Sequence, residues 1–281
     1  MHASFVEDVL DVEASDVDCL YRIARHTGTV TRVMYVTICD ASIIPAHERT
    51  ESSLILKTLR KLPGWTGHDW HTMDVLKTEA GICTEKDRTA PHALSNDILL
   101  TRVPRYNVSD VQVLSWSKHR TSRARIGGRD VFMKIAPFPY QLRYLRQEVT
   151  MYQYLLGENL PFGPELLGYV YEETPDRVIG FLCQAIRGRN PLVSDYDICT
   201  NALEGLHAKG IHYGDVNRFN ILITPDNEVV FIDFENSTPT AKSSWSDTEM
   251  ATMMQTEKHS LYDALLDQSN RGRPLGTSDQ P

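Results

Sequence analysis

The stretch from Gly210 to Ser237 constrains the fold of this chain most. It reads G-I-H-Y-G-D-V-N-R-F-N-I-L-I-T-P-D-N-E-V-V-F-I-D-F-E-N-S. Two apolar runs, residues 221–223 and 229–232, enclose the turn sequence T-P-D-N, and this pattern is typical of a tight β-hairpin. Asn220 precedes the first run and Asp233 follows the second. Because the two strands of a hairpin are antiparallel, both side chains are expected at the same end of it.

The polar residues at this end of the hairpin indicate a metal and phosphate site. Hard oxygen ligands such as the Asn220 amide and the Asp233 carboxylate suit Mg²⁺, which also takes oxygen atoms from substrate phosphates. A second carboxylate, Asp215, lies just upstream and is free to meet an incoming hydroxyl group. The alternative is that these residues only cap turns, as Asp and Asn often do. Residues further upstream distinguish the two interpretations.

Three short apolar runs upstream predict antiparallel strands, at residues 111–116, 122–126 and 130–135. The pair Gly127-Gly128 between the last two runs is a strong hairpin signal. Lys134 lies inside the third run, in the sequence V-F-M-K. A lysine in an apolar strand requires an anionic partner, unless it lies at a strand edge and points to water.

A helix with a single acidic residue follows this lysine. Helical spacing of apolar residues, with Leu145 and Val149 on one face, predicts the helix over residues 140–156. Its one acidic residue, Glu148, lies beside that face. The helix can therefore direct Glu148 back toward Lys134, and this pair favours a functional site over turn capping.

Two further strands, residues 166–172 and 177–186, complete a predicted five-stranded sheet. The polar sequence R-G-R-N-P after them predicts a break between two lobes, and a helix is expected from about Ser194 to Gly210. Downstream of the hairpin, the pattern S-x-x-E at Ser246 is a capping box that opens one more helix.

These features together resemble the protein-kinase-like superfamily. The sequence G-D-V-N-R-F-N stands where that family has H-R-D-x-x-x-x-N, D-F-E stands for D-F-G, and V-F-M-K stands for V-A-I-K. The glycine before Asp215 is similar to the aminoglycoside-phosphotransferase and RIO branches. The stretch most resembles small kinase-like proteins of filamentous fungi, whose loop reads H-G-D-x-x-x-x-N followed by I-D-F-E. The sequence D-Q-S-N-R-G at residues 267–272 also resembles their D-x-S-G-R-G ending.

The resemblance implies a role for each matching residue. Asp215 would orient the acceptor hydroxyl and accept its proton, and Asn220 with Asp233 would hold Mg²⁺. Lys134, paired with Glu148, would position the α- and β-phosphates of ATP. ATP and Mg²⁺ are therefore the expected cofactors.

The chain departs from the family pattern in two places. No G-x-G-x-x-G loop precedes the lysine strand, so phosphate contacts at the first hairpin tip would come from side chains, namely Ser115, Ser117, Lys118 or Arg120. The position two residues before the catalytic Asp holds Tyr213 instead of His. His212, next to it, is expected to be structural and not a base.

The implied fold class is α+β, a two-lobed protein-kinase-like fold with an antiparallel five-stranded small lobe and a shortened helical large lobe. Residues 1–107 are expected to be an extension on or near the small lobe, residues 108–187 the small lobe, and residues 188–281 the abbreviated large lobe. The adenine of ATP would bond to backbone groups near Gln184 and Ile186, where the lobes are linked.

The first hundred residues carry weaker local signals. Ser15 is expected to cap a helix that stops at Gly28, and residues 30–38 then predict a strand. A second helix is expected over residues 50–62. Residues 79–96 are polar and rich in turn formers, which predicts a loop.

Charge and composition limit the partners. The net charge of −8 and the lack of a basic run interleaved with aromatic residues argue against nucleic acid. No run of about 18 apolar residues is present and the amino terminus is acidic, so no membrane partner is expected. The expected location is cytoplasmic or nuclear.

The expected function is ATP- and Mg²⁺-dependent transfer of the γ-phosphoryl group to a hydroxyl of a protein or small molecule. One alternative is a pseudokinase, a nucleotide-binding scaffold without turnover, which the missing glycine loop favours. Another is a small-metabolite kinase of a secondary-metabolite pathway, which the resemblance to fungal relatives and the short large lobe favour.

Overall fold

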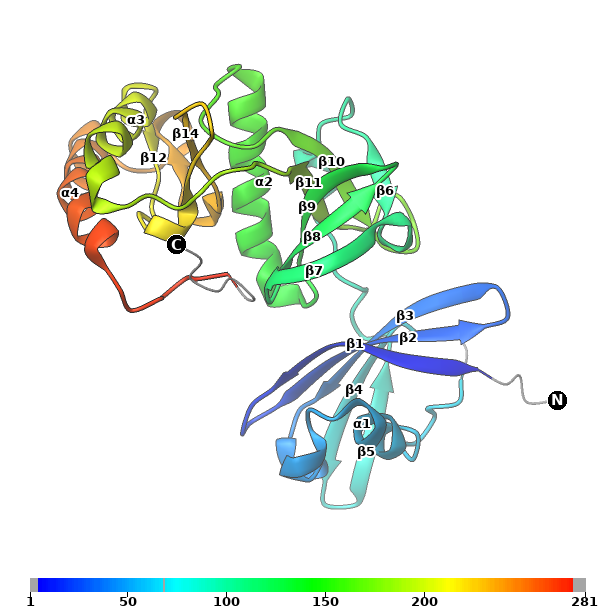
Figure 1. The fold of residues 1–281 in the computed structure, drawn as a ribbon. Helices are drawn as coiled ribbons and strands as arrows, with labels where there is room; N and C mark the ends of the chain where they lie inside the picture. Colours follow the sequence, from blue (N-terminus) through cyan, green and yellow to red (C-terminus); the bar gives the residue numbers. More distant parts are fainter. Residues whose placement is uncertain (1–4, 68, 275–281) are drawn as a thin grey trace. The chain divides into compact units, whose positions relative to one another are not determined.

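Two units make up the part of the chain that the computed structural model describes, residues 5–67 and 69–274 (Figure 1). The first unit comprises Met1–Ala93, Pro137–Tyr140 and Glu172–Arg177, and the second comprises Leu94–Ala136, Gln141–Tyr171 and Val178–Pro281. The chain folds into both helices and sheets, so the expected α+β class is confirmed. The first segment of the first unit ends at Ala93, earlier than the expected boundary after residue 107, and the three-part division of the chain stays a prediction.

The first unit contains a five-stranded sheet in the order β1 (Val6–Ala14), β2 (Cys19–Thr27), β3 (Val30–Ile38), β4 (Thr72–Thr78) and β5 (Gly81–Lys86). Neighbouring strands are antiparallel except β3 and β4, which are parallel. A parallel pair needs a crossover connection. Helix α1 (Ser52–Leu59) lies in it, after 3-10 turns at Ala41–Ile43 and Ala46–Glu48. The expected strand over residues 30–38 and the expected helix near residues 50–62 therefore correspond to β3 and α1.

Two expectations for this unit are wrong. Residues 19–27 form strand β2 and not a helix, because pairing with β1 and β3 on both sides outweighs the local helical spacing. The Ser15 hydroxyl caps a turn instead, and it accepts hydrogen bonds from the amides of Val17 and Asp18 at 3.0 Å each. Residues 81–86 form the edge strand β5, whose sequence G-I-C-T-E-K is mostly exposed and shows no alternation of apolar and polar residues.

The second unit contains a six-stranded sheet in the order β6 (Arg105–Asn107), β10 (Leu166–Tyr171), β11 (Val178–Gln184), β9 (Arg129–Ile135), β8 (Thr121–Ile126) and β7 (Gln112–Lys118). Five of these strands are the predicted ones, paired antiparallel. The sixth, β6, pairs parallel with β10 and corrects the expected count of five. Gly127 and Gly128 turn the β8–β9 hairpin with positive φ angles of 53° and 81°, which suits glycine.

Helices and two short hairpins complete the second unit. Helix α2 (Leu142–Gly157) lies beside the six-stranded sheet, and α3 (Tyr196–Ala208) and α4 (Asp247–Leu266) flank the pairs β12 (Ile211–His212) with β15 (Thr238–Pro239) and β13 (Ile221–Ile223) with β14 (Val229–Phe231) (Figure 1). The predicted hairpin at 221–232 and the capping box at Ser246 are both confirmed. None of the helices in the described ranges is long and apolar enough to cross a membrane.

Short 3-10 turns join these elements, at Asn96–Ile98, Val108–Asp110, Pro139–Gln141, Val193–Asp195, Arg218–Asn220, Phe234–Asn236 and Thr240–Lys242. Aromatic rings link the sheet to the hairpin. Tyr152 of α2 packs against Phe181 of β11 and Phe234, with ring centres 5.1 and 5.4 Å apart. Tyr213 packs against Phe231 and Phe234 at 5.0 and 5.7 Å. This chain of rings packs β11, α2 and the end of β14 against one another.

Candidate functional site

Three elements of the second unit bring their charged residues to one point. Lys134 is on β9, Glu148 is on α2, and Asp233 follows β14. The Lys134 ammonium lies 2.6 Å from a carboxylate oxygen of Glu148 and 2.6 Å from one of Asp233. Glu235 adds a third oxygen at 3.1 Å. The Lys134–Glu148 pair that the sequence predicts is therefore present, and Asp233 joins it.

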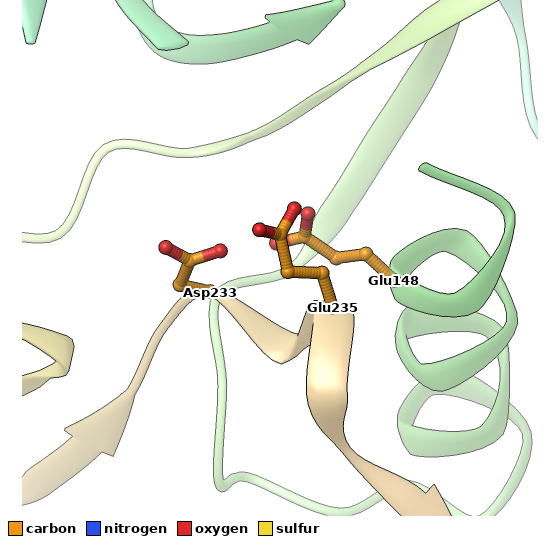
Figure 2. A group of neighbouring side chains, drawn as sticks. All are labelled: Glu148, Asp233 and Glu235. Atoms are coloured by element: carbon orange, nitrogen blue, oxygen red, sulfur yellow. The ribbon is translucent and has the colours of Figure 1, made fainter. Parts of the chain in front are cut away.

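The three carboxylates of this cluster converge, as Figure 2 shows. Three acids with oxygen atoms within 4.8 Å of one another are a plausible arrangement for a metal ion. Here, however, the Lys134 ammonium lies within ion-pair distance of all three. We therefore assign the positive charge of this cluster to Lys134 and not to a bound metal.

Burial and charge act in opposite directions on these groups. Burial lowers the pKa of Lys134, but the charges of Glu148, Asp233 and Glu235 outweigh burial and raise that pKa above its ordinary value. Burial raises the pKa of Glu148, and the nearby Lys134 charge opposes the rise. The Asp233 pKa is raised by burial, but Lys134 and Lys118 together hold it well below its ordinary value. Asp233 is therefore a carboxylate at neutral pH.

The backbone at Asp233 helps to aim its side chain. Asp233 has a left-handed conformation with φ of 63° and ψ of 62°, which Asp tolerates better than most residues do. The amide of Phe234 donates a hydrogen bond of 3.3 Å to the other carboxylate oxygen of Glu148. This bond ties α2 to the segment that carries Asp233 and Glu235.

The predicted catalytic Asp and metal-binding Asn contact each other. The Asn220 amide nitrogen donates a hydrogen bond of 3.0 Å to a carboxylate oxygen of Asp215. Burial and the neighbouring Asp233 charge raise the pKa of Asp215, while the bond from Asn220 opposes the rise. A carboxylate with a raised pKa is a stronger base, so the arrangement suits acceptance of a proton.

The tip of the β7–β8 hairpin reaches the same cluster. The Lys118 ammonium lies 2.9 Å from Asp233 Oδ2 and 3.4 Å from Asn220 Oδ1. Arg120 donates a hydrogen bond of 2.6 Å to Glu235. The sequence predicts Lys118 and Arg120 as candidates for phosphate contacts, but it does not reveal that they pair with the acidic residues that follow β14. Ser117 and Thr121 from the same tip line the cavity described below.

Glu257 of α4 supports the loop before Asp215. Its carboxylate accepts hydrogen bonds from the amides of Tyr213 at 3.0 Å and Gly214 at 2.5 Å. The Tyr213 hydroxyl lies within hydrogen-bond distance of two backbone carbonyls at the open end of the β13–β14 hairpin, Asn220 O at 3.1 Å and Ile232 O at 2.5 Å. Tyr213 therefore holds the loop by packing and hydrogen bonds. The sequence does not reveal Glu257, because its partners, the two amides and the His207 ring at 2.9 Å, lie more than 40 positions away in the chain.

His212 takes the structural role that the sequence predicts. It is buried, packs edge to face against Trp245, and lies 3.6 Å from Glu257. Burial lowers the pKa of His212 despite the Glu257 charge. These contacts of His212, Trp245 and Glu257, are not members of the Lys134 cluster, so we assign His212 no proton transfer.

A cavity of about 300 Å³ lies beside these charges in the second unit. Its walls combine the charged residues Lys118, Lys134, Glu148 and Asp233 with apolar side chains such as Phe132, Phe181 and Leu222. Gln184 and Ile186, the residues expected beside adenine, also line it. A cavity lined by both charged and apolar side chains is suited to a ligand that carries both polar and apolar groups.

Comparison with known proteins gives no family for this chain. No family model matches the sequence, and no curated protein aligns with it significantly.

Proposed function

We propose that this chain is an ATP- and Mg²⁺-dependent phosphotransferase with a protein-kinase-like second unit. It transfers the γ-phosphoryl group to a hydroxyl of a protein or a small molecule. One observation carries the proposal: a buried lysine on a strand is paired with a glutamate on the following helix and with an aspartate after a hairpin, at the wall of one cavity. The motif resemblance expects the same three partners.

Each residue of the site has a role in this proposal. Lys134, held by Glu148, donates to the α- and β-phosphate oxygens. Asp215 aligns the acceptor hydroxyl and takes its proton, since it lies beside Asn220 and carries a raised pKa. Asp233 is held as a carboxylate. Such transfer depends on positioning and electrostatic stabilisation more than on covalent chemistry by the protein.

The oxygen atoms that would hold Mg²⁺ fit a cation. Asn220 Oδ1 and Asp233 Oδ2 both face the Lys118 ammonium, so the two ligand atoms already converge on one positive charge. A carboxylate and an amide oxygen are hard donors of the kind Mg²⁺ takes, and phosphate oxygens and waters would complete its shell. When bound, the metal would neutralise charge on the β- and γ-phosphates.

A second candidate function is a nucleotide-binding scaffold without turnover. It is favoured by the contact between Lys118 and Asp233, because a fixed ammonium on the metal ligand would keep the metal out. The glycine-free hairpin tip favours it as well. A small-metabolite acceptor remains a third candidate that the structure does not favour over a protein acceptor.

The test compares nucleotide binding with turnover in matched variants. We expect Asp215→Ala to lower phosphoryl transfer by roughly 10²-fold or more while ATP affinity changes little, because Asp215 contacts neither the adenine nor the phosphates in this proposal. Asp233→Asn is expected to abolish transfer, and it should also lower the free energy of unfolding, because the largely buried Asp233 carboxylate pairs with Lys134 and Lys118. Asp226→Asn, at the exposed hairpin turn, is the matched control and should leave both quantities unchanged.

The acceptor is found with the unmodified chain, labelled ATP and a native extract. Label on proteins indicates a protein acceptor, and label on small molecules indicates a metabolite acceptor. ATP binding without transfer to any acceptor would favour the scaffold. A chain that fails to bind ATP in thermal-shift and calorimetric titrations would contradict both.

A further inference from the structure

The cation that faces the proposed metal ligands in this structure is a lysine of the chain itself. Lys118 lies at the end of β7, and its ammonium contacts Asp233 Oδ2 at 2.9 Å and Asn220 Oδ1 at 3.4 Å. These are the two side chains assigned to Mg²⁺. An ammonium and a divalent metal ion cannot share the space between the same two oxygen atoms.

The local backbone directs this lysine into the site. The β7–β8 pairing shifts register between Trp116 and Lys118, and irregularities of this kind redirect side chains at strand ends. The hairpin tip is also fastened on its other side, where Arg120 bonds to Glu235 at 2.6 Å. Lys118 therefore reaches Asp233 from a tip that is itself attached to the segment after β14.

The environment of Lys118 differs from that of Lys134, its neighbour across the cluster. The Lys134 side chain is 9% exposed and lies among three carboxylates, whereas the Lys118 side chain is 31% exposed and pairs with Asp233 alone among the carboxylates. A partly exposed ammonium is easier to separate from its partner than a buried one, because water solvates the released charge. Lys134 is thus a fixed part of the site, and Lys118 is the exchangeable cation.

We propose that Lys118 is a built-in occupant of the metal site, and that a divalent cation binds Asn220 and Asp233 only when the Lys118 ammonium leaves them. The inference rests on the metal role given to these two residues in the proposed function. Lys118 also lines the cavity, so the released ammonium stays at its wall. Metal binding and the position of the hairpin-tip lysine are then coupled.

The first test measures metal affinity directly, without nucleotide. Full-length protein is titrated with Mn²⁺, and free Mn²⁺ is followed by electron paramagnetic resonance. If Lys118 holds the site closed about nine-tenths of the time, Lys118→Met should raise Mn²⁺ affinity about tenfold. Lys209→Met makes the same chemical change at an exposed position at the end of α3 and should leave affinity unchanged. Adding Asp233→Asn to Lys118→Met should remove the gain.

The second test separates displacement from a simple loss of positive charge near the metal. An amine-acetylating reagent is applied to the unaltered protein with and without saturating Mg²⁺, and mass spectrometry follows acetylation of Lys118 with Lys209 as internal reference. Displacement predicts a several-fold faster reaction at Lys118 in Mg²⁺ and a fast reaction in Asp233→Asn without metal. The Lys209 reaction should not change.

Several outcomes would overturn the inference. These are equal Mn²⁺ affinity of the parent and Lys118→Met, no Mn²⁺ binding by either protein, retention of the gain after Asp233→Asn, or Lys118 acetylation that ignores saturating Mg²⁺. Failure of the proposed function would give results that differ from these. A chain that exchanges Lys118 for metal but never transfers phosphate keeps this inference and loses the phosphotransferase. A chain that transfers phosphate while Lys118 stays unresponsive does the reverse.

Discussion

The hydrogen bonds of Glu257 predict that this single carboxylate stabilises the loop before Asp215. It accepts from the amides of Tyr213 and Gly214, and it is buried at 7% exposure. Hydrogen bonds to a charged acceptor contribute about 1.5–3 kcal/mol each. Glu257→Gln keeps one acceptor oxygen and turns an NH₂ group toward the other amide. We therefore expect the loop to lose about 2–3 kcal/mol of stability.

Amide hydrogen exchange measures this loss where it occurs. A loss of about 2–3 kcal/mol corresponds to a rise of roughly 30- to 150-fold in the opening equilibrium, and thus in the exchange rates of the Tyr213 and Gly214 amides. Asp263→Asn is the control, since it makes the same chemical change at an exposed position of the same helix. Exchange at the two amides that is as slow in Glu257→Gln as in Asp263→Asn would refute the reasoning.

Three further predictions follow from single positions. In a urea titration, Gly214→Ala should lower the free energy of unfolding of the second unit by more than about 2 kcal/mol, because φ is 86° and the added Cβ would lie 2.1 Å from a backbone carbonyl oxygen. Gly128→Ala, with φ of 81° and open space around the added Cβ, should lower that free energy by less. Glu7→Gln should destabilise the first unit by about 3–5 kcal/mol, because its buried carboxylate pairs with two arginines, whereas the exposed Asp8→Asn should change thermal stability little. If Asp215 is the base, kcat/KM should fall as pH falls through its raised pKa, and the acid limb should disappear in Asp215→Asn.

The sequence predicts the parts of the site that depend on local pattern. The hairpin between Asn220 and Asp233 follows from turn residues and β-branched runs that are adjacent in the chain. The pairing of Lys134 with Glu148 could be predicted, because Lys134 is the only basic residue in the apolar run at 130–135 and Glu148 is the only acidic residue in the predicted helix. The burial of both residues then follows from the strand and helix that carry them.

Contacts between distant segments could not be predicted from the sequence. Lys118 meets Asp233, and Arg120 meets Glu235, across 115 positions of the chain in each case. No local sequence pattern predicts such a pairing, because a lysine in a site and a lysine on the surface can have the same neighbouring residues in the sequence. The edge strands β5 and β6 could not be predicted for a different reason. Strand β5 is mostly exposed and β6 is short, so neither shows the alternation that identifies a half-buried strand.

The charges of the cluster bear on which proposed function is correct. Four carboxylates face three cations, namely Glu148, Asp215, Asp233 and Glu235 with Lys118, Lys134 and Arg120. A nucleotide brings further negative charge, and without more positive charge it would be repelled. In the proposed function, a divalent cation at Asp233 would supply that charge and free the Lys118 ammonium at the cavity wall, where phosphate oxygens would lie. A hairpin tip with a lysine and an arginine can therefore serve phosphate binding by charge where a glycine loop would use backbone amides. In a scaffold without turnover, by contrast, Lys118 would keep its place on Asp233 whether or not metal is present.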